Sequence, residues 1–113
     1  MKILITDSID REGVQILEAE EGIQVFEDRT LKGDRLAEAI GDYDALITRS
    51  GTNVTAEILE RADKLKVIGR AGVGVDNVDI EAASRRGVVV LNTPTGNTLA
   101  ATEHTMAMML SAV

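Results

Sequence analysis

The stretch LKVIGRAGVGVDNVDIEAASRRGVVVLNTP, residues 65–94, contains two short apolar runs separated by a helix-like segment. The runs are KVIG (66–69) and VVVL (88–91). The segment between them, 79–86, ends in two basic residues and is followed by Gly87, which is typical of a helix C-terminus. An apolar run, a helix and a second apolar run form the pattern of a parallel strand–helix–strand unit. The stretch therefore predicts a fold built around parallel strands.

Three further apolar runs precede this stretch at intervals of about 20 to 22 residues, near the length of one strand and one helix. These runs are ILIT (3–6), IQVF (23–26) and ALIT (45–48). Their apolar residues are continuous rather than alternating, which favours strands covered on both faces. Helices are predicted over 9–20, 36–40 and 56–61, with Gly41 ending the second and Thr55 capping the third. We therefore predict an α/β fold, a flavodoxin-like doubly wound five-stranded parallel sheet in strand order 2-1-3-4-5 with helices on both faces.

The composition indicates one folded domain spanning residues 1–113, because 44% of the residues are hydrophobic and 27% are charged. A formal net charge of −7 argues against a nucleic-acid surface but leaves room for a local basic pocket. The chain has no cysteine, which excludes disulfides, a thiolate nucleophile and cysteine-ligated metal, and we expect no metal site. The opening run MKILIT is too short for a signal peptide or a membrane span. We therefore expect a cytoplasmic protein without a membrane partner.

Two arginines stand where strands of the predicted sheet end. Arg49 follows the run 45–48 and Arg70 follows the run 66–69. In a doubly wound sheet ligands bind beside the carboxyl ends of the strands, and these two strands are neighbours in the predicted order. Two guanidinium groups at one edge favour a clamp for a small anion that carries a carboxylate and a phosphate. The alternative is that each is an ordinary solvated arginine.

The glycine pair Gly72 and Gly74 invites comparison with the dinucleotide fingerprint GxGxxG. The third position of that fingerprint is Asn77 here, and the next apolar run is followed by Asn92 rather than by the acid that contacts a ribose. A P-loop is excluded because no Gly-Lys-Ser/Thr follows. The residues leave two interpretations open, an anion-binding loop beside Arg70 and a tight turn that requires glycine.

Two other groups suggest chemistry that their surroundings do not support. His104 follows Glu103, but adjacent residues of a helix point about 100° apart, so the two do not form an acid–base dyad. Asp7 lies where a phospho-receiver domain has an acid, but Arg49 and Asn92 follow the third and fifth runs in place of the receiver's aspartate and lysine. We assign a catalytic role to neither His104 nor Asp7.

Three segments together carry a resemblance to a known family: TRSGTNVTAEIL (48–59), the opening stretch (65–94) and GNTLAATEH (96–104). They resemble the NAD-dependent D-2-hydroxyacid dehydrogenase family, and most of all its members that oxidise 3-phosphoglycerate. The resemblance covers nearly the whole chain but only the N-terminal part of such an enzyme. It implies that the chain is a substrate-binding domain fragment.

Roles for individual residues follow from the resemblance alone. It implies that four residues contact the small anionic substrate: Arg49, Ser50, Arg70 and Asn97. The backbone amides of Gly72 and Val73 would lie against the substrate and the nicotinamide. The family's Rossmann domain and its catalytic Arg, Glu and His lie further along the chain and have no counterpart here, and His104 does not match the catalytic histidine. The resemblance therefore implies NAD in the intact enzyme, no catalytic residue in this chain, and no cofactor bound to the chain alone.

Two hypotheses about function remain. The first is the substrate-binding portion of such a dehydrogenase, inactive in isolation, whose intact parent oxidises 3-phosphoglycerate to 3-phosphohydroxypyruvate in serine biosynthesis. The second is an autonomous flavodoxin-like module that binds a small anion or serves as a scaffold. An apolar stripe formed by Leu99, Met106, Leu110 and Val113 predicts a helix over 98–113, which in the family leads into the Rossmann domain. We expect this stripe to dock on the chain's own sheet or on a second copy, and therefore a homodimer.

Overall fold

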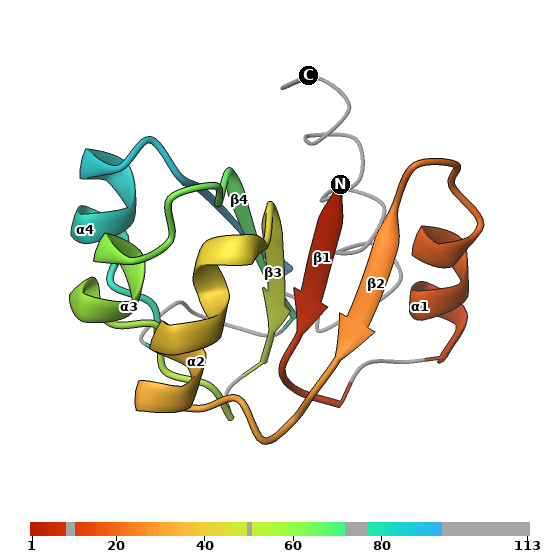
Figure 1. The fold of residues 1–113 in the computed structure, drawn as a ribbon, viewed down its shortest axis with the longest axis horizontal. Coiled ribbons are helices and arrows are strands. Elements are labelled where there is room, and N and C mark those ends of the chain that lie inside the picture. Colours follow the sequence, from red (N-terminus) through yellow and green to blue (C-terminus); the bar gives the residue numbers. More distant parts are fainter. Residues whose placement is uncertain (9–10, 50, 72–76, 94–113) are drawn as a thin grey trace.

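The five apolar runs form one parallel sheet (Figure 1). The computed structural model describes residues 1–8, 11–49, 51–71 and 77–93, and all five strands lie within them. The strand order is β2-β1-β3-β4-β5, and every neighbouring pair is parallel. The strands are β1 (Lys2–Ile5), β2 (Gln24–Glu27), β3 (Ala45–Thr48), β4 (Val67–Ala71) and β5 (Val89–Thr93). The predicted α/β fold and its strand order are confirmed.

The helices of the described residues alternate with the strands. They are α1 (Arg11–Glu18), α2 (Asp34–Ala39) followed by the 3₁₀ turn η1 (Ile40–Asp42), α3 (Ala56–Glu60) and α4 (Ile80–Arg85). Thr55 caps α3 as predicted, because its hydroxyl accepts a hydrogen bond from the amide of Ile58 at 3.3 Å. The carboxylate of Asp79 caps α4 in the same way, and Gly87 beyond that helix has a φ of 73°, as a helix C-terminus favours. The predicted helix over 98–113 lies outside the described residues.

The prediction that Gly41 ends the second helix is wrong in detail. The α-helix ends at Ala39, but the chain continues through Gly41 in a 3₁₀ turn that ends at Asp42. A Cβ at Gly41 would lie 3.2 Å from the carbonyl oxygen of Arg61. The glycine therefore allows a close approach between this turn and the end of α3.

The two faces of the sheet are covered by different helices. Leu4, Leu46 and Ile68 pack with side chains of α2, α3 and α4 on one face. Ile5 and Ile47 pack with α1 on the opposite face. Figure 1 shows α1 on one side of the sheet and the other three helices on the other side. Because both faces are covered, all four residues of β3 and the last three residues of β1 are buried, which explains why the runs are continuous in the sequence.

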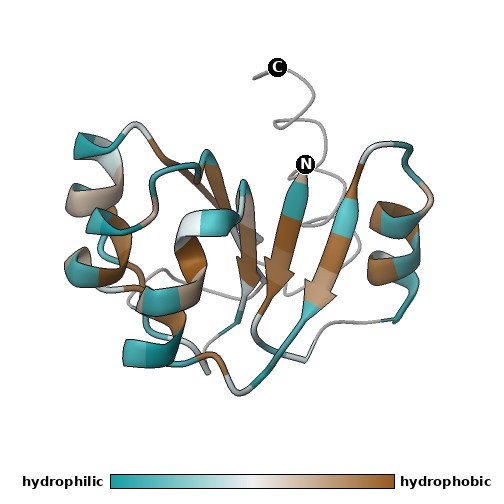
Figure 2. Ribbon diagram, viewed as in Figure 1, coloured by the Kyte–Doolittle hydropathy of each residue, from teal (hydrophilic) through white to brown (hydrophobic). Residues whose placement is uncertain are grey.

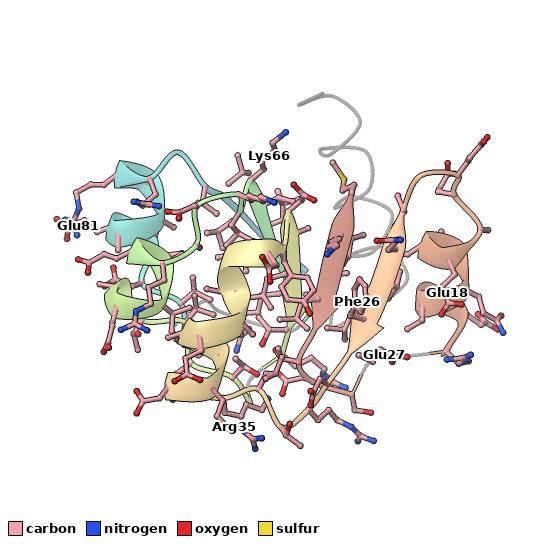
Figure 3. The ribbon with its side chains drawn as sticks, viewed as in Figure 1. Glu18, Phe26, Glu27, Arg35, Lys66 and Glu81 are labelled. Atoms are coloured by element: carbon pink, nitrogen blue, oxygen red, sulfur yellow. The ribbon has the colours of Figure 1, made fainter. Side chains whose placement is uncertain are left out.

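Polar residues lie mainly on the outer surface. Figure 2 shows apolar residues concentrated in the strands and on the inner sides of the helices. The side chains of Glu18, Arg35, Lys66 and Glu81 are exposed and point away from the sheet (Figure 3). Against this pattern, the buried polar or charged residues among those described are Thr6, Thr48, Thr52 and Arg70. They direct attention to the carboxyl edge of the sheet.

Strands β4 and β5 extend further than the apolar runs. The sequence predicts strands that end at residues 69 and 91, whereas β4 continues to Ala71 and β5 to Thr93. The two extensions pair with each other, with Arg70 opposite Asn92. Arg70 is therefore part of a strand, and its backbone position is set by the sheet rather than by a loop.

Candidate functional site

The sheet brings the ends of β1, β3 and β4 together at one edge. Strand β1 pairs with β2 on one side and β3 on the other, so the order reverses between β1 and β3. The carboxyl ends at this switch point are where doubly wound folds bind their ligands. Thr48, the last residue of β3, pairs with Arg70 of β4, and Arg49 follows immediately. The two predicted arginines therefore come from neighbouring positions of the same edge.

The carboxylate of Asp7, two residues beyond β1, lies at the centre of this edge. Its Oδ2 accepts a hydrogen bond from the amide of Arg49 at 2.6 Å and another from the hydroxyl of Thr48 at 2.7 Å. Its Oδ1 accepts from the ammonium group of Lys32 at 2.5 Å. The side chain of Asp7 is only 11% exposed, so these bonds are largely shielded from water. Asp7 therefore fixes the backbone of Arg49 relative to β1.

Lys32 completes a polar cluster around Asp7. Besides Asp7, its ammonium group donates to the carbonyl of Thr6 at 2.6 Å and to the hydroxyl of Thr52. Thr52 is also joined to Thr6 by a hydrogen bond of 2.9 Å between the two hydroxyls. An ammonium group has three donors, and all three are used here. Lys32 therefore holds the edge together and is not available as a ligand for a bound anion.

The hydrogen bonds around Asp7 also determine its charge state. Burial alone would raise the pKa of the Asp7 carboxyl, but hydrogen bonds from Lys32, the Arg49 amide, Thr48 and Thr52 outweigh it and lower that pKa below its ordinary value of 3.8. The carboxylate is consequently ionised at neutral pH and is a weak base. Asp7 is suited to holding its neighbours in place rather than to accepting a proton from a substrate.

The two arginines differ in exposure. The side chain of Arg49 is exposed, and its Nη1 donates to the carbonyl of Ser8 at 3.3 Å. Arg70 is only 7% exposed, because it belongs to β4, and its Nε donates to the side-chain oxygen of Asn77. The sequence predicts two arginines at the edge, and the structure gives one exposed and one buried side chain.

Asn77 is a further member of this edge, which its place in the sequence did not indicate. Its Nδ2 donates to the carbonyl of Arg49 at 2.8 Å and to the carbonyl of Thr52 at 2.6 Å, while its Oδ1 accepts from Arg70. In the sequence, Asn77 served only to rule out a third fingerprint glycine. An asparagine between a strand and a helix commonly bonds to backbone groups, which is the one signal that could have identified it.

The other predicted substrate and cofactor contacts lie outside the described residues. They are Ser50, Gly72, Val73 and Asn97. Their roles stay predictions.

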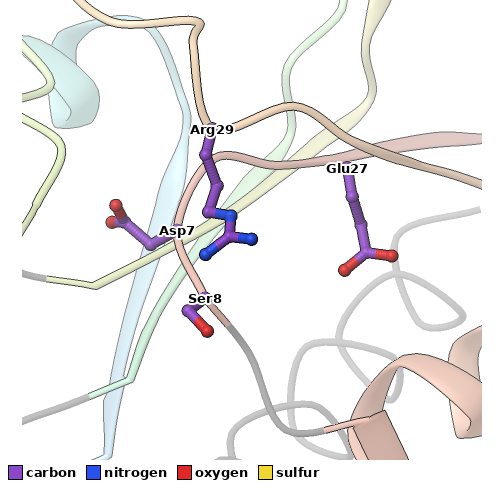
Figure 4. Close-up of a pocket in the computed structure, with 4 residues that line it drawn as sticks. All are labelled: Asp7, Ser8, Glu27 and Arg29. Carbon is purple, nitrogen blue, oxygen red and sulfur yellow. The ribbon is translucent and has the colours of Figure 1, made fainter.

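A polar cavity of about 310 Å³ opens beside the edge (Figure 4). Asp7, Ser8, Glu27 and Arg29 line it, and the Arg29 side chain extends between the two carboxylates. Neither Arg49 nor Arg70 is among the lining residues. With two carboxylates and one guanidinium, the cavity does not have the positive charge that a dianion requires. Its lining residues Asp7 and Ser8 both accept hydrogen bonds from Arg49, so the cavity borders the arginine without including it.

Two further findings concern the described part of the chain. No helix there is both long and apolar enough to cross a membrane. The same residues contain no group of three or more histidine, aspartate or glutamate side chains placed to hold a metal ion.

Comparison with known proteins places the chain in a family. A sequence profile described as D-isomer specific 2-hydroxyacid dehydrogenase, catalytic domain, matches residues 3–110. The chain belongs to the D-isomer specific 2-hydroxyacid dehydrogenase family. The matched range includes both arginines of the edge and all five strands except Lys2, the first residue of β1.

Relatives within this dehydrogenase family share close to half of the sequence. Proteins named D-3-phosphoglycerate dehydrogenase from Synechocystis and from Rattus norvegicus are 47% and 50% identical over 110 and 109 residues. These matches cover 97% and 96% of this chain but 20% of each relative, so the chain spans about a fifth of their length. The structure of NAD⁺-bound 3-phosphoglycerate dehydrogenase from Entamoeba histolytica is 36% identical, with a TM-score of 0.74 over 96% of this chain and 38% of that one.

We predict that Asp7→Asn lowers the free energy of unfolding by about 1 to 3 kcal/mol at neutral pH, because it removes charge-assisted hydrogen bonds from a shielded site. The folded-state pKa of Asp7 is lowered, so its contribution is complete well above 3.8 and is lost as the pH falls below that value. Urea unfolding of both proteins over a series of pH values measures the difference, which should shrink towards the acid end.

The matched control is Asp63→Asn. Asp63 pairs with Arg86 at 3.2 Å, but its side chain is 81% exposed, so its loss should cost at most about 1 kcal/mol. A difference between wild type and Asp7→Asn that stays constant down to the lowest pH at which both fold would contradict the assigned role of Asp7.

Proposed function

We propose that this chain is the substrate-binding portion of a D-3-phosphoglycerate dehydrogenase, with Arg49 and Arg70 holding the anionic groups of 3-phosphoglycerate. The observation that carries the proposal is the pairing of Thr48 with Arg70, which places the backbones of Arg49 and Arg70 at adjacent strand ends in a chain of net charge −7. The names of the relatives support the choice of substrate.

The arrangement suits a small dianion. Arginine presents a planar fork of donors that matches carboxylate and phosphate oxygens, and neighbouring strands of a sheet lie about 4.8 Å apart. Two such forks carried by adjacent strand ends can each take one anionic group of a three-carbon substrate. Four residues outside the described ranges complete the proposed site, with substrate contacts from Ser50 and Asn97 and with the amides of Gly72 and Val73 against substrate and nicotinamide.

The described residues do not form a site for the rest of a dinucleotide. Strand β5 ends at Asn92 and Thr93, so no carboxylate follows it to bind a ribose, and the loop after β4 has Asn77 where the fingerprint needs its third glycine. We infer that NAD is held by other parts of the intact enzyme. There it would oxidise 3-phosphoglycerate to 3-phosphohydroxypyruvate, the entry step of serine biosynthesis, as a cytoplasmic enzyme.

Titration calorimetry of the 113-residue chain with 3-phosphoglycerate tests the substrate site. We expect binding that Arg49→Ala weakens roughly tenfold or more, because a hydrogen bond between two charged groups contributes about 1.5 to 3 kcal/mol. Arg85→Ala is the matched control: it removes the same charge from an exposed position in the last turn of α4. No heat from the wild-type chain would refute the substrate site and favour a flavodoxin-like scaffold.

The same chain should produce no NADH from 3-phosphoglycerate and NAD⁺. The family's catalytic Arg, Glu and His have no counterpart in its sequence, and the Asp7 carboxylate is held as a hydrogen-bond acceptor with a lowered pKa. Absorbance at the NADH band, recorded beside a full-length relative as positive control, provides the measurement. Turnover that Arg70→Ala abolishes would show that the chain is a complete enzyme.

We also infer that the chain forms a homodimer through the apolar stripe predicted over 98–113. Exposed apolar area of that kind is usually covered in solution. Light scattering should give twice the chain mass of 12.1 kDa for the wild type. The variant Leu110→Glu should give the mass of a single chain. A monomer mass for wild type at high concentration would exclude this assembly.

A further inference from the structure

The side chain of Asn77 connects the two arginines. Its amide oxygen accepts from Nε of Arg70, and its amide nitrogen uses both hydrogens, one towards the carbonyl of Arg49 and one towards the carbonyl of Thr52. The Asn77 side chain therefore contacts both the guanidinium group of Arg70 and the backbone of Arg49. The hydrogen bonds of Asn77 thus connect Arg49 to Arg70 through a single side chain.

We propose that Asn77 is a positioning residue of the anion site, setting the orientation of the Arg70 guanidinium and its distance from Arg49. This inference rests on the proposed function, since it assumes that the two arginines act on one anion. Asn77 itself need not touch that anion, because it acts through the residues that do.

The geometry requires an amide at this position. The planar guanidinium rotates about its side-chain bonds, and an acceptor on Nε fixes the plane and so the direction of its terminal nitrogens. The two backbone carbonyls require donors from the same side chain. Asparagine supplies one acceptor and two donors, aspartate at neutral pH supplies acceptors only, and alanine supplies neither.

The backbone around Asn77 is held independently of its side chain. The amide of Val54 donates to the carbonyl of Asn77 at 2.7 Å, and the amide of Asp79 donates to the carbonyl of Val54 at 2.9 Å. Val54 and Val78 form an isolated parallel bridge, and both are buried. Replacing the side chain of Asn77 leaves these bonds in place, so the variants should fold.

The experiment compares Asn77→Ala and Asn77→Asp with wild type by two readouts. Nitrogen-15 NMR follows hydrogen exchange at Nε of Arg70, assigned by its absence in Arg70→Lys. Calorimetry measures binding of 3-phosphoglycerate. Asn53→Ala is the matched control for the loss of an exposed amide from the loop after β3. Ile40→Val, at a fully buried core position, is the control for lost stability alone.

We expect Asn77→Ala to speed exchange at Nε of Arg70 at least tenfold and to weaken 3-phosphoglycerate binding at least fivefold. Asn77→Asp should keep the slow exchange, because it retains the acceptor, yet still weaken binding, because it loses both donors and adds a negative charge. Asn53→Ala and Ile40→Val should bind within twofold of wild type.

The possible failures are distinguishable. Wild-type binding that Asn77→Ala leaves within twofold would overturn the positioning role and leave the proposed function standing. Binding that falls equally in Ile40→Val would also overturn it, because lost stability would then account for the effect. If the wild-type chain does not bind 3-phosphoglycerate, the proposed function fails and the role of Asn77 in an anion site fails with it, whatever the exchange at Arg70 shows.

Discussion

The hydrogen bonds of one carboxylate determine the geometry of the whole carboxyl edge. Asp7 follows β1, Lys32 comes from the connection between β2 and α2, and Thr48 and Arg49 lie at the end of β3. Three chain segments that are distant in sequence therefore meet on two oxygen atoms. Because the carboxylate is charged and shielded, its bonds are stronger than those of a neutral side chain in water. The position of Arg49 is consequently defined by the fold and not by a flexible loop.

The fold tolerates these buried polar side chains because their polar atoms all form hydrogen bonds. Thr6, Thr48 and Thr52 are at most 1% exposed, and no buried side-chain nitrogen or oxygen of the described residues lacks a hydrogen-bond partner. An unpaired hydroxyl there would cost more than the apolar contacts around it could offset. The edge thus combines a rigid polar framework with the exposed guanidinium of Arg49 at its rim.

The sequence predicted the sheet well because the signal is simple: five continuous apolar runs at regular spacing leave little choice of topology. It also placed Arg49 and Arg70 on one edge, since parallel strands end on the same side. The sequence could not predict that Arg70 is buried. Strands β4 and β5 continue past their apolar runs because the residues beyond those runs pair with each other, and Arg70 is one of them. Lys32 gave no signal, since 25 residues separate it from Asp7. The sequence marked Asn77 only as a missing glycine, and its bonds depend on how the loop that contains it packs against strand β4 and the loop after β3.

The difference in exposure between the two arginines has a thermodynamic consequence for any ligand they share. An arginine that is free in solvent gives up about 2 kcal/mol of rotamer entropy when a ligand immobilises it. Arg49 is exposed, so most of this entropy loss would occur on binding and would reduce the free energy of binding at this end of the site. The side chain of Arg70 has already lost this rotamer entropy on folding, because the strand and its neighbours enclose it. Equal contacts to the two guanidinium groups would therefore contribute unequally to affinity, with the larger net share at Arg70.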